Sequence, residues 1–341
     1  CVKPSDGSGD FDFSRNSAAT RVNAQGLVEN VQSLSSNLIT NGSFDTDSDW
    51  NLNGWNISGG SANNDGINTG NINQNIGLQQ NKFYKISISI TNYVSGALKV
   101  RLGTGNQINV GSSNGEYILY LENTTTNPNI RFYPDATLNF QGSIDNVSVR
   151  EVIDNTNLPR INYEGFSYDG SGNVVPDSGC GSWLFEPQST NLITYSEDFS
   201  DAVWTKNSVS LESGYLAPDG TNSAYKVTST GSQAHLYTGG NFTGIKHKSI
   251  YARTLSGTGT VNLCNRNSDT NALFTITEQW QRFDISHSDV DLFYAVDFRG
   301  AGATLSEVII WGAQLEEQSY ATSYIPTSGS TVTRNQDVCT N

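Results

Sequence analysis

The sequence predicts an all-β protein: two jelly-roll β-sandwich modules on a small strand-rich scaffold. The first observation is composition. Only 15% of the 341 residues are charged, and Asn, Ser, Thr and Gly, which favour turns and exposed strand faces over helix interiors, fill the deficit. The second is an apolar–polar alternation with a period of two along several short segments. The third is an internal repeat, which predicts that the sandwich occurs twice.

The repeat is visible as SNLITNGSFDTDSDW at residues 36–50 and TNLITYSEDFSDAVW at residues 190–204. Asn37 and Asn191 are separated by the same number of residues as Trp50 and Trp204. Each copy also ends in an apolar strand, residues 144–149 or 308–315, followed closely by a glutamate. Because the two tryptophans occupy equivalent positions, we expect both to lie in the cores of their modules.

The strand pattern is clearest at residues 85–91, where Ile86, Ile88 and Ile90 share one face and two serines share the other. Residues 117–121 are more evenly apolar, which predicts a strand buried on both faces. No segment sustains a helical period. Several short strands per module with one buried face are typical of a two-sheet sandwich.

The modules are set among other segments. Residues 1–30 and 154–188 flank the first module, and we expect them to be the halves of one discontinuous strand-rich scaffold unit. The first module, residues 31–153, would then be an insertion whose two ends lie close together. Residues 189–325 form the second module. Residues 326–341 contain no core strand pattern and are predicted to be a linker toward a C-terminal part outside this chain.

Charge and cysteine content limit the classes of partner. The formal net charge of −14 disfavours binding to nucleic acids and to anionic membranes. No apolar run approaches the roughly 20 residues of a membrane span. The four cysteines Cys1, Cys180, Cys264 and Cys339 include no C-x-x-C pair, so zinc and thiol redox chemistry lack support. They allow two disulfides in three connectivities, between which the sequence does not choose.

Longer blocks carry a family resemblance. They read FDFSRNSAATRVNAQGLVE, LPRINYEG, GCGSWLFEPQSTNLITYSEDFSDAVWTK, APDGTNSAYKVT and WGAQLEEQSYATSYIPTSGSTVTRNQDVC. In this order they resemble structural proteins of tailed bacteriophages, and residues 36–152 resemble the carbohydrate-binding-module-like jelly rolls inserted in such proteins. The resemblance implies a tail, fibre or surface appendage of the virion, a homo-oligomer in contact with other virion subunits, and binding of a host cell-surface glycan.

Two alternatives remain open. One is a secreted or surface-anchored bacterial carbohydrate-binding protein, attached as a lipoprotein through Cys1. The other is the accessory part of a polysaccharide-degrading enzyme. The chain itself is expected not to be an enzyme, because its three histidines, His235, His247 and His287, have no metal-ligand spacing and no nucleophile or phosphate-loop motif is present.

Sugar-binding sites combine an aromatic ring, on which the CH face of a sugar packs, with polar side chains for the hydroxyls. The candidates in the first module are Trp55, Tyr93 and Tyr133, the last with Arg131 and Asp135 close by in sequence. The candidates in the second module are Tyr237, Trp280 and Tyr294. For each of these rings the competing interpretation is a place in the core or in a subunit contact.

The acidic run Asp45-Thr-Asp-Ser-Asp49 suggests calcium, but it is not an EF-hand loop: the sixth position holds Trp50 instead of Gly and the twelfth holds Asn56 instead of Glu. The jelly-roll resemblance implies a different structural calcium site between the first and last strands. Asn41, Asp45 and Asp145 are its expected ligands. The competing interpretation is a solvated acidic turn.

Overall fold

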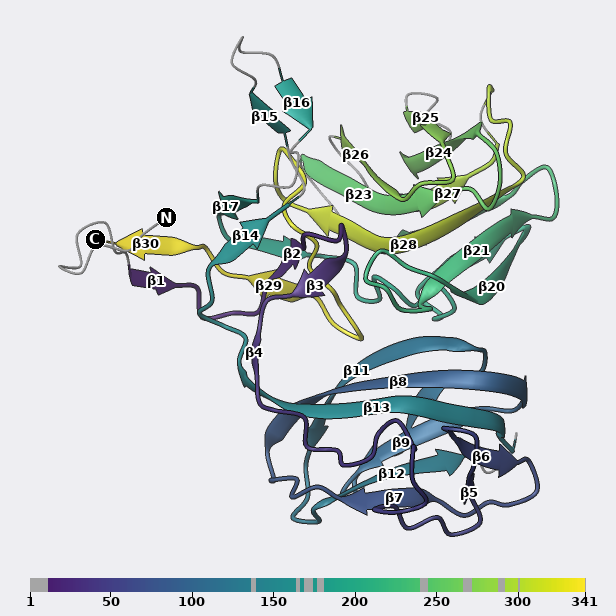
Figure 1. Ribbon diagram of the computed structural model, residues 1–341. Coiled ribbons are helices and arrows are strands. Elements are labelled where there is room, and N and C mark those ends of the chain that lie inside the picture. Colours follow the sequence, from purple (N-terminus) through teal and green to yellow (C-terminus); the bar gives the residue numbers. More distant parts are fainter. Residues whose placement is uncertain are drawn as a thin grey trace. The chain divides into compact units, whose positions relative to one another are not determined.

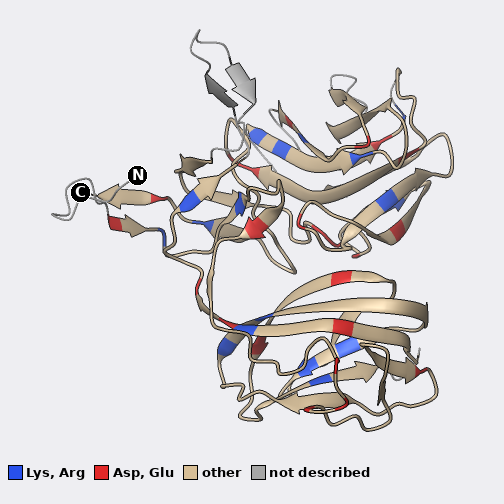
Figure 2. Ribbon diagram, in the orientation of Figure 1, with Lys and Arg blue, Asp and Glu red and all other residues tan. Residues whose placement is uncertain are grey.

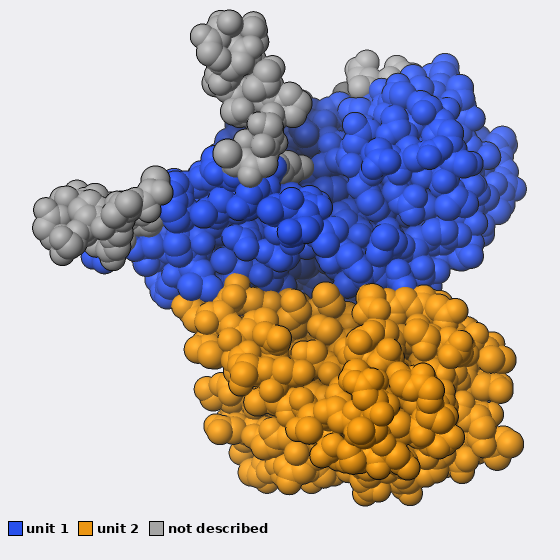
Figure 3. All heavy atoms as spheres, viewed as in Figure 1, with its two compact units in different colours: residues 1–31, 155–341 blue, residues 32–154 orange. Residues whose placement is uncertain are grey.

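The computed structural model describes residues 12–135, 139–163, 166–168, 174–176, 181–239, 245–265, 272–287, 292–299 and 301–340. The chain divides into two compact units, residues 1–31 with 155–341 (unit 1) and residues 32–154 (unit 2), which Figure 3 shows in different colours. The described residues form strands and no α-helix, which confirms the predicted all-β class (Figure 1). They accordingly include no helix long and apolar enough to cross a membrane.

Unit 2 is a sandwich of two antiparallel sheets. One sheet has the order β10-β9-β12-β7, and the other has the order β11-β8-β13-β6-β5, with β4 also paired to β13. The strands are β4 (Ser33–Leu34), β5 (Asn56–Ile57), β6 (Ala62–Asp65), β7 (Ile72–Asn75), β8 (Lys82–Ser95), β9 (Leu98–Leu102), β10 (Ile108–Gly111), β11 (Gly115–Asn123), β12 (Asn129–Pro134) and β13 (Gln141–Asp154). Because β4 pairs with the end of β13, the two ends of the unit lie side by side.

The core of unit 2 follows from the alternation in the sequence. Ile86, Ile88 and Ile90 of β8 are fully buried between the sheets, as their shared face predicted. The apolar run at residues 117–121 is different. It belongs to β11, which is an edge strand, and Tyr120 is 38% exposed, so the prediction of burial on both faces was wrong. Tyr120 instead uses its hydroxyl to accept a hydrogen bond from Gln32.

Unit 1 contains a second sandwich. Its sheets have the orders β19-β22-β27-β24-β25 and β20-β21-β28-β23-β26. The strands are β19 (Thr205–Asn207), β20 (Val209–Tyr215), β21 (Ala224–Ser229), β22 (His235–Gly239), β23 (Lys246–Arg253), β24 (Gly259–Asn265), β25 (Leu273–Ile276), β26 (Gln281–His287), β27 (Leu292–Asp297) and β28 (Glu307–Glu316). Strands β5–β13 correspond in chain order to β20–β28, and corresponding strands have the same neighbours. The two modules therefore share one topology.

The repeated asparagine has the same role in both sandwiches. Asn37 Oδ1 accepts hydrogen bonds from the backbone N–H two residues on (3.2 Å) and from the N–H of Val149 (3.0 Å). Asn191 Oδ1 accepts from the N–H two residues on (3.1 Å) and from the N–H of Leu315 (3.1 Å). Each asparagine thus fixes the entering segment against the long last strand of its own module.

The repeated tryptophans are core residues, as their equivalent positions predicted. Trp50 donates from Nε1 to the carbonyl of Asn41 (3.0 Å), and Trp204 donates to the carbonyl of Tyr195 (2.9 Å). Both rings are buried. An indole N–H in a core needs an acceptor, and the turn before each tryptophan supplies one.

The rest of unit 1 consists of short two-stranded ladders that join segments far apart in the sequence. They are β1 (Asp12–Ser14) with β30 (Val338–Thr340), β2 (Thr20–Val22) with β3 (Val28–Asn30), β14 (Arg160–Asn162) with β17 (Ser182–Leu184), β15 (Phe166–Tyr168) with β16 (Val174–Pro176), and β18 (Ser189–Asn191) with β29 (Val332–Arg334). Residues 326–341, expected as a linker, therefore supply two strands to unit 1.

A buried ion cluster holds the same segments together. Asp337 pairs with Arg15 (3.1 Å) and with Arg160 (2.5 Å), and all three side chains are buried. Glu186 pairs with Arg160 (2.9 Å) and with Arg334. The charges come from both ends of unit 1 and from its middle, which is why no local sequence pattern indicated the cluster.

Of the four cysteines, the two that the structure describes are not in disulfides: Cys264 is buried and Cys339 is exposed. Cys1 and Cys180 lie outside the described residues.

Candidate functional site

The outer face of the four-stranded sheet in unit 2 collects a ring, cations and amides. Along β9 and β12 alternate side chains enter the core, so Lys99 and Arg101 of β9 and Arg131 and Tyr133 of β12 all point away from it. The register places Arg131 between Arg101 on one side and Asn73 of β7 on the other. Tyr133 is opposite Lys99. We call this surface the Arg–Tyr face.

The strands of this sheet carry positive charge only. Strands β7, β9, β10 and β12 contain Lys99, Arg101 and Arg131 but no Asp or Glu (basic and acidic residues are coloured in Figure 2). Lys99 forms an ion pair with Asp135, just beyond β12, at 2.5 Å. Within the described chain, Arg101 and Arg131 have no carboxylate partner.

Two further contacts define how the arginines are held. Arg131 donates to the carbonyl of Gly103 and to Oδ1 of Asn127 (3.3 Å), so its guanidinium is anchored by neutral acceptors. The guanidinium of Arg101 lies over the ring of Tyr133, 5.4 Å from its centroid. Arg101 Nε is buried without a hydrogen-bond acceptor in the described structure. Neither guanidinium group therefore has an anionic partner among the described residues at this face.

A row of amides continues the face along β7. Asn73 donates from Nδ2 to Oδ1 of Asn71 (2.8 Å), and Asn73 is directly opposite Arg131. Strand β10 is the other neighbour of β9, and its Asn109 is opposite Lys99. An aromatic ring flanked by amide and guanidinium donors has the two kinds of group that a sugar requires.

The corresponding sheet of unit 1 also carries rings, but its described strands place no two cations opposite each other. Tyr237 of β22 and Tyr294 of β27 are cross-strand partners, and their rings stack with centroids 5.0 Å apart. His235 packs against both rings, and burial together with the nearby Arg299 lowers its pKa, which favours the neutral imidazole. Arg299 is bound to Asp297 by two hydrogen bonds of 2.9 and 2.8 Å. His235 and Tyr294 are 5% and 3% exposed, so little of this cluster reaches the surface.

The structure brings together Arg131 and Tyr133 but not the other rings expected in unit 2. Trp55 is 5% exposed, stacks on Phe140 in the core and donates to the carbonyl of Gly70 (3.1 Å). Tyr93 is partly buried against the same core, and its hydroxyl donates to the carbonyl of Gly96 (2.9 Å). Both rings therefore fill and close the sandwich.

In unit 1, Trp280 lies partly buried against the cluster around Tyr251 and Trp311. Its Nε1 donates to the carbonyl of Leu216 (3.1 Å), and the guanidinium of Arg253 lies 5.4 Å from its ring. Trp280 directly precedes β26, which belongs to the other sheet from that of the stacked Tyr237 and Tyr294, so these three expected rings do not form one platform.

The expected calcium ligands are engaged locally. Asn41 uses its side chain to close the acidic turn, donating to the carbonyls of Thr46 (2.6 Å) and Ser48 (3.0 Å). Asp45 accepts from Ser43 Oγ (2.6 Å), and Asp145 accepts from the next backbone N–H (2.6 Å). Within the described residues, no group of three or more His, Cys, Asp and Glu side chains is close enough to hold a metal ion. Calcium binding stays a prediction.

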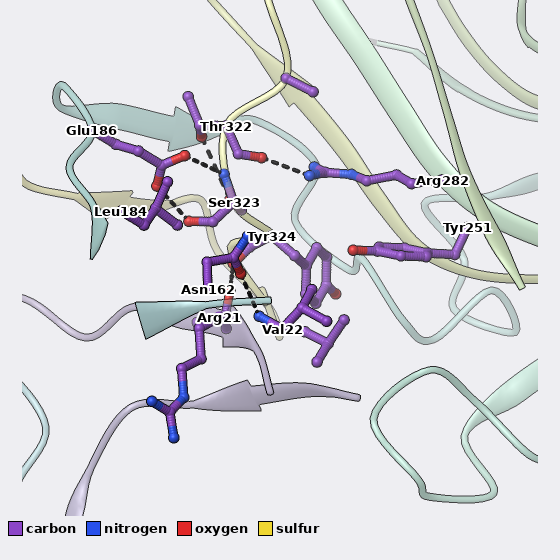
Figure 4. Close-up of a pocket in the computed structure, with 13 residues that line it drawn as sticks. Arg21, Val22, Asn162, Leu184, Glu186, Tyr251, Arg282, Thr322, Ser323 and Tyr324 are labelled. Atoms are coloured by element: carbon purple, nitrogen blue, oxygen red, sulfur yellow. Dashed lines mark hydrogen bonds between the residues drawn. The ribbon is translucent and has the colours of Figure 1, made fainter. Parts of the chain in front are cut away.

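Unit 1 also contains a small cavity of about 180 Å³ beside β2, β14 and β17 (Figure 4). Its polar groups bond to one another: Glu186 accepts from the N–H (2.7 Å) and hydroxyl (2.6 Å) of Ser323, and Arg282 donates to the carbonyl of Thr322 (2.7 Å). Ligand pockets span roughly 300–1,000 Å³. The size makes this cavity a poor site for a saccharide, although Nε of Arg282 has no acceptor among the described residues.

One carboxyl group in unit 1 has a strongly shifted pKa. Burial and the nearby Asp219 raise the pKa of Glu197 to about 7. Its Oε1 accepts a hydrogen bond from the Tyr324 hydroxyl (2.9 Å), which also contacts Ser196 Oγ (2.7 Å). These bonds connect the turn after β18 to the segment after β28, so we assign the group a structural role.

Sequence reasoning found Arg131 and Tyr133 but missed Arg101, Lys99 and Asn73. The signal was present in LKVRL at residues 98–102 and NIRFYP at residues 129–134, where every second residue is apolar. This alternation places the charged residues on one face of each strand. Only the pairing of β9 with β12, which the sequence does not show, makes them neighbours.

No protein-family model matches the chain, and no curated protein matches it. Among solved structures it is similar to the N-terminal CBM22-1–CBM22-2 tandem of Paenibacillus barcinonensis Xyn10C, at 12% identity over 86% of this chain and 99% of that one, with a TM-score of 0.24. The tandem CBM51 modules of the family 98 glycoside hydrolase Sp3GH98 from Streptococcus pneumoniae SP3-BS71 are similar at 10% identity over 90% and 97%, with a TM-score of 0.21. At such scores the fold assignment rests on the strand order described above.

Proposed function

We propose that the chain is a non-catalytic glycan-binding protein and that the Arg–Tyr face of unit 2 is its binding surface. The observation that carries the proposal is the grouping of the Tyr133 ring with Arg101, Arg131 and Asn73 on one face of a sheet. The CH face of a pyranose packs on an aromatic ring, while guanidinium and amide groups bond its oxygen atoms. Strands hold these groups in fixed register, as a repeating polymer requires.

Binding without turnover is favoured by the chemistry of the face. Glycoside hydrolysis needs two carboxyl groups on opposite sides of the scissile bond. The four strands of this sheet supply none, and Asp135, beside β12, is committed to Lys99. Glu197, whose pKa of about 7 would suit a general acid, lies in the other unit within a hydrogen-bonded network.

The biological setting is proposed from sequence alone. The ordered blocks at residues 11–29 and 158–339 resemble phage structural proteins, so we place the chain on a virion surface, in an oligomer with other virion subunits. The alternative is a bacterial secreted or surface-anchored carbohydrate-binding protein. Immunogold labelling of purified phage particles and of host cells with an antibody against the chain separates the two. Symmetric labelling of particles supports the virion, and labelling of cells alone excludes it.

The binding proposal is tested with the full chain on an array of bacterial and algal polysaccharides, followed by titration calorimetry on a polymer that binds. Tyr133→Ala should weaken binding at least tenfold, about 1.4 kcal/mol. Tyr120→Ala is the matched control, because Tyr120 is a partly exposed tyrosine on the outer sheet edge of the same unit. Binding of no polysaccharide, or equal loss in both variants, would refute the proposal.

A further inference from the structure

We infer that the Arg–Tyr face selects polysaccharides bearing carboxylate or sulfate groups over neutral ones. The inference rests on the proposed glycan-binding function and names the class of ligand. Its basis is the pair Arg101 and Arg131, which occupy directly opposite positions on β9 and β12. A guanidinium fork matches the planar carboxylate and the sulfate oxygens through two parallel hydrogen bonds.

The arginine pair has an electrostatic cost in the protein alone. Like charges directly opposite each other on neighbouring strands destabilise a sheet. In this case neither guanidinium group forms an ion pair with a described carboxylate, and Asp135 is paired with Lys99. The ring of Tyr133 compensates Arg101 only in part, through its quadrupole. An anion bound between the forks would remove the repulsion and would be selected for that reason.

The excess of negative charge on the whole chain does not oppose this. The net charge is −14, but at physiological ionic strength exposed charges are screened beyond roughly 8 Å. The potential at the face is therefore governed by the groups on it. Those on its strands are all basic: Lys99, Arg101 and Arg131.

Two other sheet faces of the chain serve as comparisons for this arrangement. In unit 1 the arginine near the corresponding sheet, Arg299, is neutralised by two bonds to Asp297. On the other sheet of unit 2, Lys85 and Arg150 are also directly opposite each other. On the adjacent strand β11, Tyr120 is opposite Lys85 and Glu122 follows two residues along, and neither Lys85 nor Arg150 forms an ion pair among the described residues. That second pair supplies a matched control for the experiment.

The experiment uses affinity electrophoresis and titration calorimetry of the full chain with named polymers. Polygalacturonate supplies carboxylates and its fully methyl-esterified form is the neutral match. Dextran sulfate supplies sulfates and dextran is its neutral match. Single-stranded DNA serves as a polyanion without sugar carboxylates or sulfates. The variants are Arg101→Gln/Arg131→Gln and the control Lys85→Gln/Arg150→Gln, which removes the same charge from the same unit.

We expect one charged polymer to bind at least tenfold more tightly than its neutral match and than the DNA. The first double variant should lose at least tenfold of that affinity and the control should keep it. Which charged polymer binds distinguishes carboxylate from sulfate recognition. Removal of the arginines relieves repulsion but also removes the bonds of Arg131 to Gly103 and Asn127, so the melting of the variant is measured beside its affinity to separate lost binding from lost folding.

The other outcomes overturn the inference in distinguishable ways. Equal binding of charged and neutral polymers that still depends on Tyr133 overturns the selectivity and leaves the proposed function intact. Equal losses in both double variants, or DNA binding as tight as that of the polysaccharides, would mean unspecific attraction of polyanions. Binding of no polymer, including those of the array, overturns the inference and the proposed function together.

Discussion

Asp337 is expected to hold the C-terminal segment within unit 1, and Asp337→Ala tests this. The carboxylate accepts bonds from Arg15 and Arg160 and from the backbone N–H of Glu186 (2.9 Å). Both arginine side chains are fully buried. Its removal leaves two guanidinium groups in the interior with only Glu186 as their remaining acidic partner in the cluster.

The size of the effect follows from burial. Removal of one partner from a buried ion pair costs about 3–5 kcal/mol, because the remaining charge is left without compensation. A surface pair contributes only about 0–1 kcal/mol. Arg21 and Glu29 form such a pair at 2.8 Å, with side chains 31% and 38% exposed. Glu29→Ala is therefore the matched control within the same unit.

Urea titration followed by amide hydrogen exchange reports the two units separately. For Asp337→Ala we expect the midpoint of unit 1 to fall by about 1–2 M urea, while peptides from residues 32–154 keep their protection. Glu29→Ala should move the midpoint by less than about 0.5 M. A loss below about 1 kcal/mol for Asp337→Ala would show that residues 326–341 are a dispensable extension and that the ion cluster is not a structural tie.

Three further predictions concern stability. In urea titration, Asn191→Ala should lower the free energy of unfolding by about 2–3 kcal/mol and Asn37→Ala by about 1 kcal/mol. The difference is expected because Asn191 is fully buried with four hydrogen bonds, whereas Asn37 is exposed, and equal losses would contradict it. Glu197 is destabilising when ionised, because its pKa is raised in the folded state to about 7: stability should fall as pH rises from about 4.5 through 7. Glu197→Gln should therefore stabilise the chain by about 1–2 kcal/mol at pH 8 but not at pH 4, and a pH-independent difference would refute the assignment. If calcium binds at Asn41, Asp45 and Asp145, EDTA should lower the melting midpoint by about 3 °C or more relative to calcium buffer, whereas identical midpoints leave the acidic turn solvated.

Local patterns predicted the sandwich class and part of its core. The alternating isoleucines of β8 and the equivalent tryptophans Trp50 and Trp204 are buried as expected, because alternation and repetition are properties of nearby or duplicated residues. The edge position of β11 was not predictable in the same way, because strand order depends on pairing between distant segments. The role of residues 326–341 escaped for a related reason: Arg334 and Asp337 find their partners about 150 or more positions away, at Glu186, Arg160 and Arg15.

The candidate site shows the same division. Aromatic identity alone did not separate Trp55, a core residue, from Tyr133, which lies on the outer face. The difference lies in the neighbours: Tyr133 stands between Phe132 and Pro134 in an alternating strand, so its ring must point away from the core. Arg101 becomes part of the site only through the register of β9 with β12. Residue type identifies candidate binding residues, and the apolar–polar alternation shows on which face of a strand each one lies. Only the pairing of strands in the fold shows which of them are neighbours.

Because the two modules share one topology, the charges on their corresponding sheet faces can be compared directly. Corresponding strands in one fold start from the same structural constraints, so a difference between corresponding faces is not imposed by the fold. In unit 1 the outer face of the corresponding sheet carries stacked, largely buried rings, and the arginine near it is neutralised by Asp297. In unit 2 the same sheet carries Arg101 opposite Arg131 without an acidic partner in the described structure. The fold does not require Arg101 opposite Arg131, and the proposed bound anion accounts for the pair, so the double arginine variant, more than any change of an aromatic residue, tests the proposed recognition by unit 2.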